Sequence, residues 1–135
     1  MHLPGYVLKR ASTAAMAELN RKLASLHLRH AEVAFLMLLA TTPGITQSAA
    51  GRLIDIQRAN MVPLVARLQR RGLVSRQRVD GRSQGLMLTA AGRSTLIRAR
   101  RVVEASEAAL LDRVPARLRP MVLPVLTALW KSSTT

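Results

Sequence analysis

Arginine side chains are concentrated in one stretch of this 135-residue sequence. Between Gln57 and Arg82 there are seven arginines and a single acidic residue, Asp80. The planar guanidinium group donates paired hydrogen bonds to a phosphate or to the edge of a guanine base. The whole chain carries a formal net charge of +14, which implies a polyanionic partner, a membrane surface or an acidic protein. The preponderance of arginine favours phosphate and guanine among these.

Residues suited to catalysis or to metal binding are few. The chain has no cysteine, three histidines and seven acidic residues. We find no paired carboxylates, nucleophile elbow or glycine-rich phosphate loop. His27, His30 and Glu32 loosely suggest a metal site, but the two histidines lie at the junction of a loop and a helix and lack a fourth ligand. The sequence therefore predicts neither an enzyme nor a site for a metal or cofactor.

Hydrophobic spacing predicts a mainly α-helical chain with one small β-hairpin. Amphipathic helices are expected over residues 6–26 and 116–131, and a central helix over 30–40 that is apolar on nearly every side. Two short helices are expected after Thr46 and from Arg58 to Arg71, and a long helix over 90–112. Segments 73–79 and 86–88 alternate in period two around a turn, which is typical of a hairpin.

The ends and inward faces of these helices can also be predicted. Thr46 and Thr89 are expected to be N-caps, and Gly72 is expected to end the helix that begins at Arg58. Pro124 lies inside the last helix and should kink it. The helix after Thr46 is expected to turn four apolar side chains inward: Ala49, Ala50, Leu53 and Ile54.

Two short helices followed directly by a basic hairpin form a winged helix-turn-helix, in which one helix fits the major groove of DNA and the hairpin reaches the backbone or minor groove. If the apolar stripe of the helix from Arg58 faces the core, its outward residues are small or basic, with Asn60 and Arg67 on one flank. The outward residues are Ala59, Pro63, Ala66 and Arg70. Asn60 carries the amide that pairs with adenine. Pro63 removes one helical hydrogen bond and bends the axis.

These segments resemble the MarR family of regulators. The resemblance covers essentially the whole chain and includes Gly5–Arg10, Gln47–Leu53, Arg58–Leu68 and Arg71–Val74. Its most specific part is Asp80-Gly81-Arg82 followed by Leu86-Met87-Leu88-Thr89-Ala90-Ala91-Gly92. Gln57 and Pro63 depart from the residues common in the family, which weakens the expected helix start and the expected base contact at position 63.

The resemblance implies one domain, residues 1–135, that acts as a homodimer. Residues 30–92 would be the winged helix-turn-helix lobe, and residues 5–27 and 93–131 the dimerisation helices. The apolar stripes of 6–26 and 118–130 agree, since they lack a partner in so small a monomer. The expected function is sequence-specific binding to a pseudo-palindromic operator in double-stranded DNA, as a repressor released by a small ligand such as an aromatic acid.

The resemblance also assigns site residues. The helix from Arg58 would be the recognition helix, Arg82 would enter the minor groove, and Asp80 would orient Arg82 through an ion pair. The complete set expected to contact DNA is Thr46, Gln47, Arg58, Ala59, Asn60, Pro63, Arg67, Arg70, Arg76, Arg78, Arg82 and Ser83. For Arg67, Arg70 and Arg71 the alternative is a solvated face. The polar candidates for an effector site are Arg21, His27, His30 and Arg52. A histidine at a helix start, as His30 is, is more often a capped or solvated residue than a ligand contact.

Two further alternatives concern partner and location. A winged helix can bind RNA or a protein, but RNA recognition usually uses aromatic stacking platforms. The chain has one Phe, one Tyr and one Trp, all outside the basic stretch. The N-terminus shows no signal-peptide pattern, and the longest apolar stretch, 31–40, is far shorter than the roughly 20 residues of a membrane span. A cytoplasmic protein without a membrane partner is therefore expected.

Overall fold

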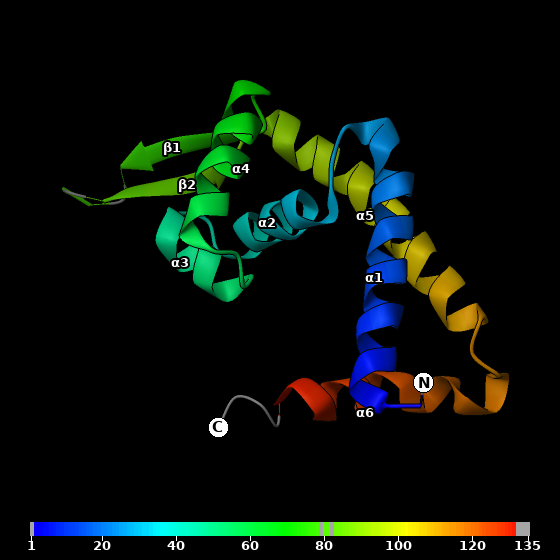
Figure 1. The fold of residues 1–135 in the computed structure, drawn as a ribbon. Helices are drawn as coiled ribbons and strands as arrows, with labels where there is room; N and C mark the ends of the chain where they lie inside the picture. The colour runs from blue at the N-terminus through cyan, green and yellow to red at the C-terminus, as the bar shows by residue number, and fades with distance from the viewer. Residues whose placement is uncertain (1, 79, 82, 132–135) are drawn as a thin grey trace. The chain divides into compact units, whose positions relative to one another are not determined.

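The computed structural model describes residues 2–78, 80–81 and 83–131. Within them the chain is mainly α-helical with one two-stranded hairpin, as predicted (Figure 1). The elements in chain order are α1 (Pro4–Leu23), η1 (Ala24–Leu26), α2 (His30–Thr41), α3 (Gln47–Leu53), α4 (Arg58–Arg70), β1 (Val74–Arg78), β2 (Gln84–Leu88), α5 (Ala90–Asp112), η2 (Ala116–Leu118) and α6 (Arg119–Lys131). The chain divides into two compact units, Met1–Val102 and Val103–Thr135.

Helix α2 supplies the centre of the hydrophobic core in the first unit. Its side chains Phe35, Leu36 and Leu39 are buried, as are Val65 and Leu68 of α4. This confirms the predicted buried central helix. No single helix in the described part of the chain is long and apolar enough to cross a membrane; α1 with η1 and α2 would qualify together by length and composition, but they are bent by 74° at their junction.

Helices α3 and α4 form the predicted helix-turn-helix. The Thr46 hydroxyl accepts a hydrogen bond from the Ala49 N–H at 3.2 Å, which confirms the predicted N-cap. The buried side of α3 consists of Ala50 and Gly51. Leu53, expected to face inward, is 66% exposed, so that prediction is wrong. With only two turns of helix, the small residues that touch α4 set the rotation of α3, and spacing alone does not reveal it.

The hairpin extends from α4 as a wing. Strands β1 and β2 are antiparallel, with Val74 opposite Leu88 and Arg78 opposite Gln84. The chain just before α3 adds a bridge to β2: the Leu86 N–H donates to the Ile45 carbonyl and the Gly44 N–H to the Leu86 carbonyl, both at 2.9 Å. Gly44 adopts φ +85°, which a glycine tolerates without strain. The wing is therefore hydrogen-bonded to the segment that leads into α3.

The base of the wing is fastened to α5 by Thr89. Its hydroxyl accepts from the Gly92 N–H at 2.9 Å, which confirms the predicted N-cap, and donates to the Gly72 carbonyl at 2.6 Å. Gly92 is buried, and a Cβ atom there would collide with the carbonyl oxygen of Leu73. Gly72 ends α4 with φ +72°. The hydroxyl of Thr89 thus connects the segment after α4 with the start of α5, at the end of β2.

The N-terminal helix begins two residues earlier than predicted, because Pro4 fits its first turn. It tightens into η1, after which His27 adopts the left-handed conformation at φ +53°.

In the second unit, the Arg119 Nε donates to the Leu111 and Val114 carbonyls at 3.0 and 2.9 Å, which satisfies acceptors at the end of α5. Pro124 lies inside α6, which continues to Lys131. The predicted helix over 116–131 is thus a 3₁₀ turn followed by an α-helix.

Candidate nucleic-acid interface

Helix α4 exposes small side chains at its N-terminal half. Ala59, Asn60 and Pro63 are exposed, whereas Met61 and Leu64 are buried against the core. Ala66, expected to point outward, is half-buried. A helix that presents small groups and one amide can approach the floor of a major groove closely.

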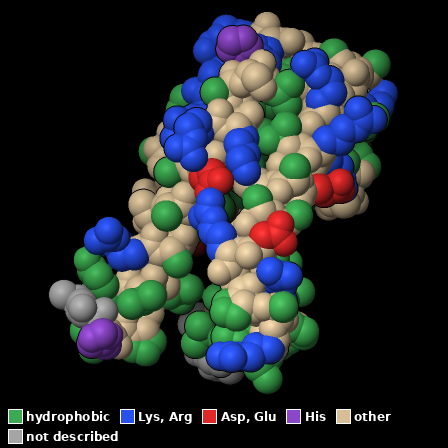
Figure 2. Space-filling view, turned by 90° about the vertical axis from the view of Figure 1, so that its right-hand side faces the viewer, with side chains coloured by type: hydrophobic (Ala, Val, Ile, Leu, Met, Phe, Trp, Pro, Cys, Tyr) green, Lys and Arg blue, Asp and Glu red, His purple; other side chains and the backbone are tan. Residues whose placement is uncertain are grey.

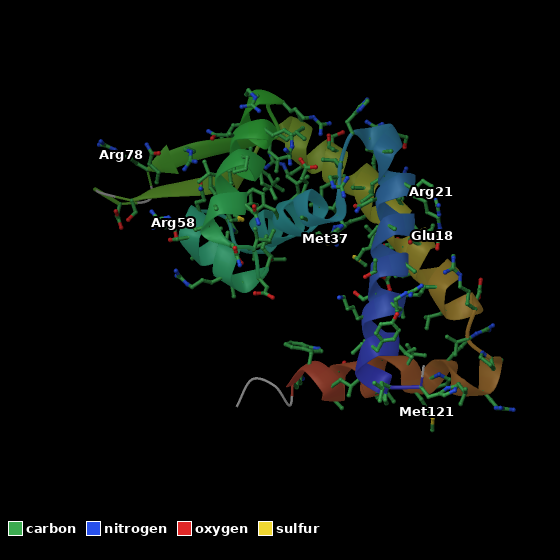
Figure 3. All side chains as sticks on the ribbon, viewed as in Figure 1. Glu18, Arg21, Met37, Arg58, Arg78 and Met121 are labelled. Atoms are coloured by element: carbon green, nitrogen blue, oxygen red, sulfur yellow. The ribbon has the colours of Figure 1, made fainter. Side chains whose placement is uncertain are left out.

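A groove of about 690 Å³ lies beside this helix. It is formed where the starts of α3 and α4 face the wing, and it is lined by Thr46, Gln47, Ser48, Gly51, Arg52, Ile56, Arg58, Met61, Arg76, Ser83 and Gln84. Among the described residues of this lining, three are arginines and none is acidic. Figure 3 shows Arg58 on α4 and Arg78 on β1 on the same side of the lobe. A concave, cationic and water-accessible surface of this kind suits an anionic backbone.

Arg76 joins the wing to both helices. Its Nη2 donates to Gln47 Oε1 at 2.7 Å and its Nε to Gln69 Oε1 at 3.2 Å. The three side chains come from β1, α3 and α4, so their network fixes the distance between the wing and the helix-turn-helix. The sequence indicated Gln47 and Arg76 as separate contacts; their mutual bond depends on a separation of 29 residues that no local pattern reports.

Arg67 of α4 and Arg71, the residue that follows this helix, both donate hydrogen bonds to other parts of the lobe. Arg67 Nε lies 2.9 Å from Oε2 of Glu32, a carboxylate with 2% residue exposure. Arg71 donates to the carbonyls of His27 at 2.7 Å and Leu26 at 3.0 Å. Sequence spacing placed Arg67 beside Asn60 on the flank of the helix but gave no indication of these partners.

The tip of the wing is described in part. The Asp80 Oδ1 accepts a hydrogen bond from the Ser83 N–H at 2.7 Å, which closes the turn. Arg82 lies outside the described residues. Its entry into a minor groove and its ion pair with Asp80 therefore stay predictions.

The four effector-site candidates lie in different surroundings. Arg52 lines the groove beside α3, and Arg21 is exposed on α1 (Figure 3). His30 is half-buried: its N–H donates to Asn20 Oδ1 at 2.7 Å, and its Nδ1 lies 3.0 Å from the same oxygen. His27 is exposed. Among the described residues, no group of three or more His, Asp or Glu side chains is placed to hold a metal ion.

Positive charge extends beyond the groove. On the face drawn in Figure 2, Lys and Arg side chains are spread over much of the surface and acidic side chains are sparse. Outside the groove, α5 carries the exposed arginines Arg93, Arg98, Arg100 and Arg101. The basic composition is therefore visible as surface charge.

Fold and groove together define a winged helix-turn-helix protein. A family model described as "MarR family" matches residues 28–83. The HTH-type transcriptional repressor Rv2887 of Mycobacterium tuberculosis is 32% identical over 114 residues, 83% of this chain and 82% of that protein. The chain belongs to the MarR family, which confirms the resemblance seen in the sequence.

Solved structures share the fold over nearly the whole chain. The transcriptional repressor CouR bound to a 23-mer DNA duplex superposes with a TM-score of 0.86 at 35% identity, covering 94% of this chain and 92% of CouR. The Mycobacterium tuberculosis protein Rv2887 in complex with salicylic acid gives a TM-score of 0.79 at 29% identity, covering 96% of this chain and 97% of that protein.

Proposed function

We propose that this protein is a transcriptional repressor that binds a specific sequence in double-stranded DNA as a homodimer. The observation that carries the proposal is the small, exposed surface of α4 beside a groove lined by Arg52, Arg58 and Arg76. Small residues allow close approach to bases, and arginines neutralise the flanking phosphates. The DNA-bound structure of CouR supports the same use of this fold. The role is regulatory rather than enzymatic, and its location is the cytoplasm.

The dimer rests on apolar surface that a single copy leaves exposed. In the second unit Met121, Leu123, Val125, Leu129 and Trp130 are all more than half exposed. An apolar groove of about 370 Å³ is lined by Val114, which lies between α5 and η2, and by side chains of η2 and α6. Continuous apolar surface of this kind marks a protein interface.

Helix α1 adds exposed apolar residues near its start, Tyr6, Val7 and Leu8. Residues 5–27 and 93–131 would therefore form the interface, and residues 30–92 the DNA-binding lobe. Two lobes related by twofold symmetry would read half-sites about one helical turn apart.

A small aromatic acid is the proposed effector, by analogy with the salicylic acid bound to Rv2887. A ligand that binds better to one lobe spacing shifts the population toward it. If that spacing does not match two half-sites, the repressor leaves the operator. Arg21, His27, His30 and Arg52 stay the candidate contacts for the carboxylate.

The test begins with duplexes selected by the purified protein from a random-sequence pool. Gel-shift titrations then compare a selected duplex, a scrambled duplex and the corresponding single-stranded RNA, each with and without sodium salicylate. We expect tight binding to the selected duplex alone and weakened binding with salicylate. Preference for the single strand, or failure to enrich any duplex, would contradict the DNA-binding proposal; enrichment without a response to salicylate would contradict only the effector class.

A further inference from the structure

We propose that Arg67 and Arg71 are positioning residues, which hold α4 against the α1–α2 junction and do not serve as phosphate contacts. The inference rests on the proposed function, and it changes the role that the sequence favoured for Arg67. It follows from three observations. Arg67 pairs with a buried carboxylate, Arg71 donates to two backbone carbonyls, and the neighbouring Arg70 makes neither kind of contact with the described residues.

The first observation is Glu32, whose two oxygens are both engaged. Oε1 accepts from the Arg29 N–H at 2.9 Å, and Oε2 accepts from Arg67 Nε at 2.9 Å. The Glu32 side chain is 3% exposed and that of Arg67 48%. A buried carboxylate requires its counter-charge, so Arg67 is held in place. Because the pair sums to zero charge, Arg67 adds little to the attraction for a polyanion.

The second observation is Arg71, which directly follows the last residue of α4 and lies four residues after Arg67. It directs two N–H groups of its guanidinium at the Leu26 and His27 carbonyls, which lie where η1 ends. Carbonyls at a helix end lack donors from their own helix. Arg67 and Arg71 therefore attach α4 at two points, and two points one turn apart fix both the rotation and the axial position of a helix.

The third observation is Arg70, between these two residues. Arg70 is exposed, lies on the outward side of the helix, and makes no side-chain hydrogen bond or ion pair with any other described residue. Its full positive charge is available to a ligand. Of these three arginines, Arg70 is thus an exposed cation, whereas Arg67 and Arg71 attach α4 to the rest of the lobe.

The junction that receives these anchors is itself attached to α1. Asn20 of α1 accepts hydrogen bonds from His30 at the start of α2. Glu32 lies in the same first turn of α2. Helix α4 is consequently connected through α2 to α1 by polar contacts as well as by the core.

Salt dependence of DNA binding distinguishes an anchor from a phosphate contact. Each phosphate contact contributes about 0.9 to the slope of log K against log salt concentration. We would measure this slope for the wild type, Arg67→Gln, Arg71→Gln and the matched control Arg70→Gln. The probes are a duplex selected by the wild type and a scrambled duplex, and active concentrations are set by titration so that partial unfolding does not enter the affinity.

For Arg67→Gln and Arg71→Gln we expect an unchanged slope and a ratio of selected to scrambled affinity that falls about tenfold, as when one base contact is weakened. For Arg70→Gln we expect the slope to fall by about 0.9 and both affinities to fall together. The double variant Glu32→Gln/Arg67→Gln replaces the pair by neutral groups and should keep the wild-type slope even if Arg67→Gln alone does not fold.

A slope reduced by about 0.9 in Arg67→Gln or in the double variant, with equal losses on both duplexes, would overturn the inference while leaving the DNA-binding function intact. An unchanged affinity ratio in both single variants would overturn it as well. Failure of the wild type to select any duplex would instead refute the proposed function.

Discussion

Gly92 allows α5 to pack closely against the base of the wing, because it has no side chain. It lies in the first turn of α5, where a Cβ atom would collide with the backbone of Leu73. The contact is with a carbonyl oxygen and not with a flexible side chain, so the neighbour has little freedom to yield. The close approach of α5 to the base of the wing therefore depends on glycine at this position.

We expect Gly92→Ala to lower the free energy of unfolding by about 2 kcal/mol, the usual cost of overpacking. Gly5→Ala is the matched control, because an added Cβ there meets nothing within 4 Å and lies in helix α1. It should be neutral or raise stability by ~0.5 kcal/mol. Urea denaturation followed by circular dichroism measures both, and equal stabilities of the two variants would argue against the collision.

Asn60 is the side chain on α4 best suited to read a base. It is exposed beside small residues, and its amide can pair with adenine. We expect Asn60→Ala to reduce the preference for a selected duplex over a scrambled one by about 1–3 kcal/mol and to leave scrambled binding nearly unchanged. A uniform loss on both duplexes in fluorescence-anisotropy titrations would show instead that Asn60 has a structural role.

At the scale of elements, we make one prediction about the wing from the sequence alone. Arg82 lies outside the described residues; in the sequence it stands between Asp80 and Ser83, which are joined by a hydrogen bond. We expect Arg82→Ala to weaken operator binding by about 1–3 kcal/mol, the size of one groove contact. Gly81→Ala serves as the control for a change near the wing tip, because an added Cβ atom there meets nothing within 4 Å. An unaltered dissociation constant for Arg82→Ala would remove the wing tip from the interface.

Elements with a strong local signal were predictable from the sequence. The hydroxyls of Thr46 and Thr89 cap the expected helices, and the buried stripe of α4 contains Met61 and Leu68 as its spacing indicated. The inward direction of Leu53 was predicted wrongly, because α3 is too short for spacing to fix its rotation.

Contacts between distant elements were not predictable in the same way. The ion pair between Glu32 and Arg67 and the hydrogen bond from Arg76 to Gln47 join residues 35 and 29 positions apart, and no periodic pattern indicates such pairs. Arginine content identified the basic stretch, but not which arginines remain free to meet a ligand. Only the tertiary structure distinguishes the arginines that bind other parts of the protein from those available to a ligand.

At the scale of the whole molecule, the exposed apolar surface predicts that assembly is required. Leu123 on α6 is 74% exposed, and Met121, Val125, Leu129 and Trp130 of the same helix are also more than half exposed. We expect Leu123→Glu to shift the protein from dimer to monomer in analytical ultracentrifugation, because it places a charge in a surface that is buried on association. Its unfolding temperature should also lose the dependence on protein concentration expected of an obligate dimer.

Ser48→Glu is the control for this prediction. Ser48 lines the groove beside α3, so a negative charge there should weaken binding to DNA and leave the dimer intact. If Leu123→Glu sediments as the wild type does, the exposed surface of α6 serves some purpose other than association.

The hydroxyl of Thr89 has a consequence for motion. It donates to the carbonyl of Gly72, just after α4, and accepts from the N–H of Gly92 in the first turn of α5, and Thr89 directly follows the last residue of β2. A tilt at the start of α5 must therefore move the hairpin and α4 together with it. Release from an operator would then proceed by changing the spacing between two intact lobes, with each lobe keeping its internal geometry throughout.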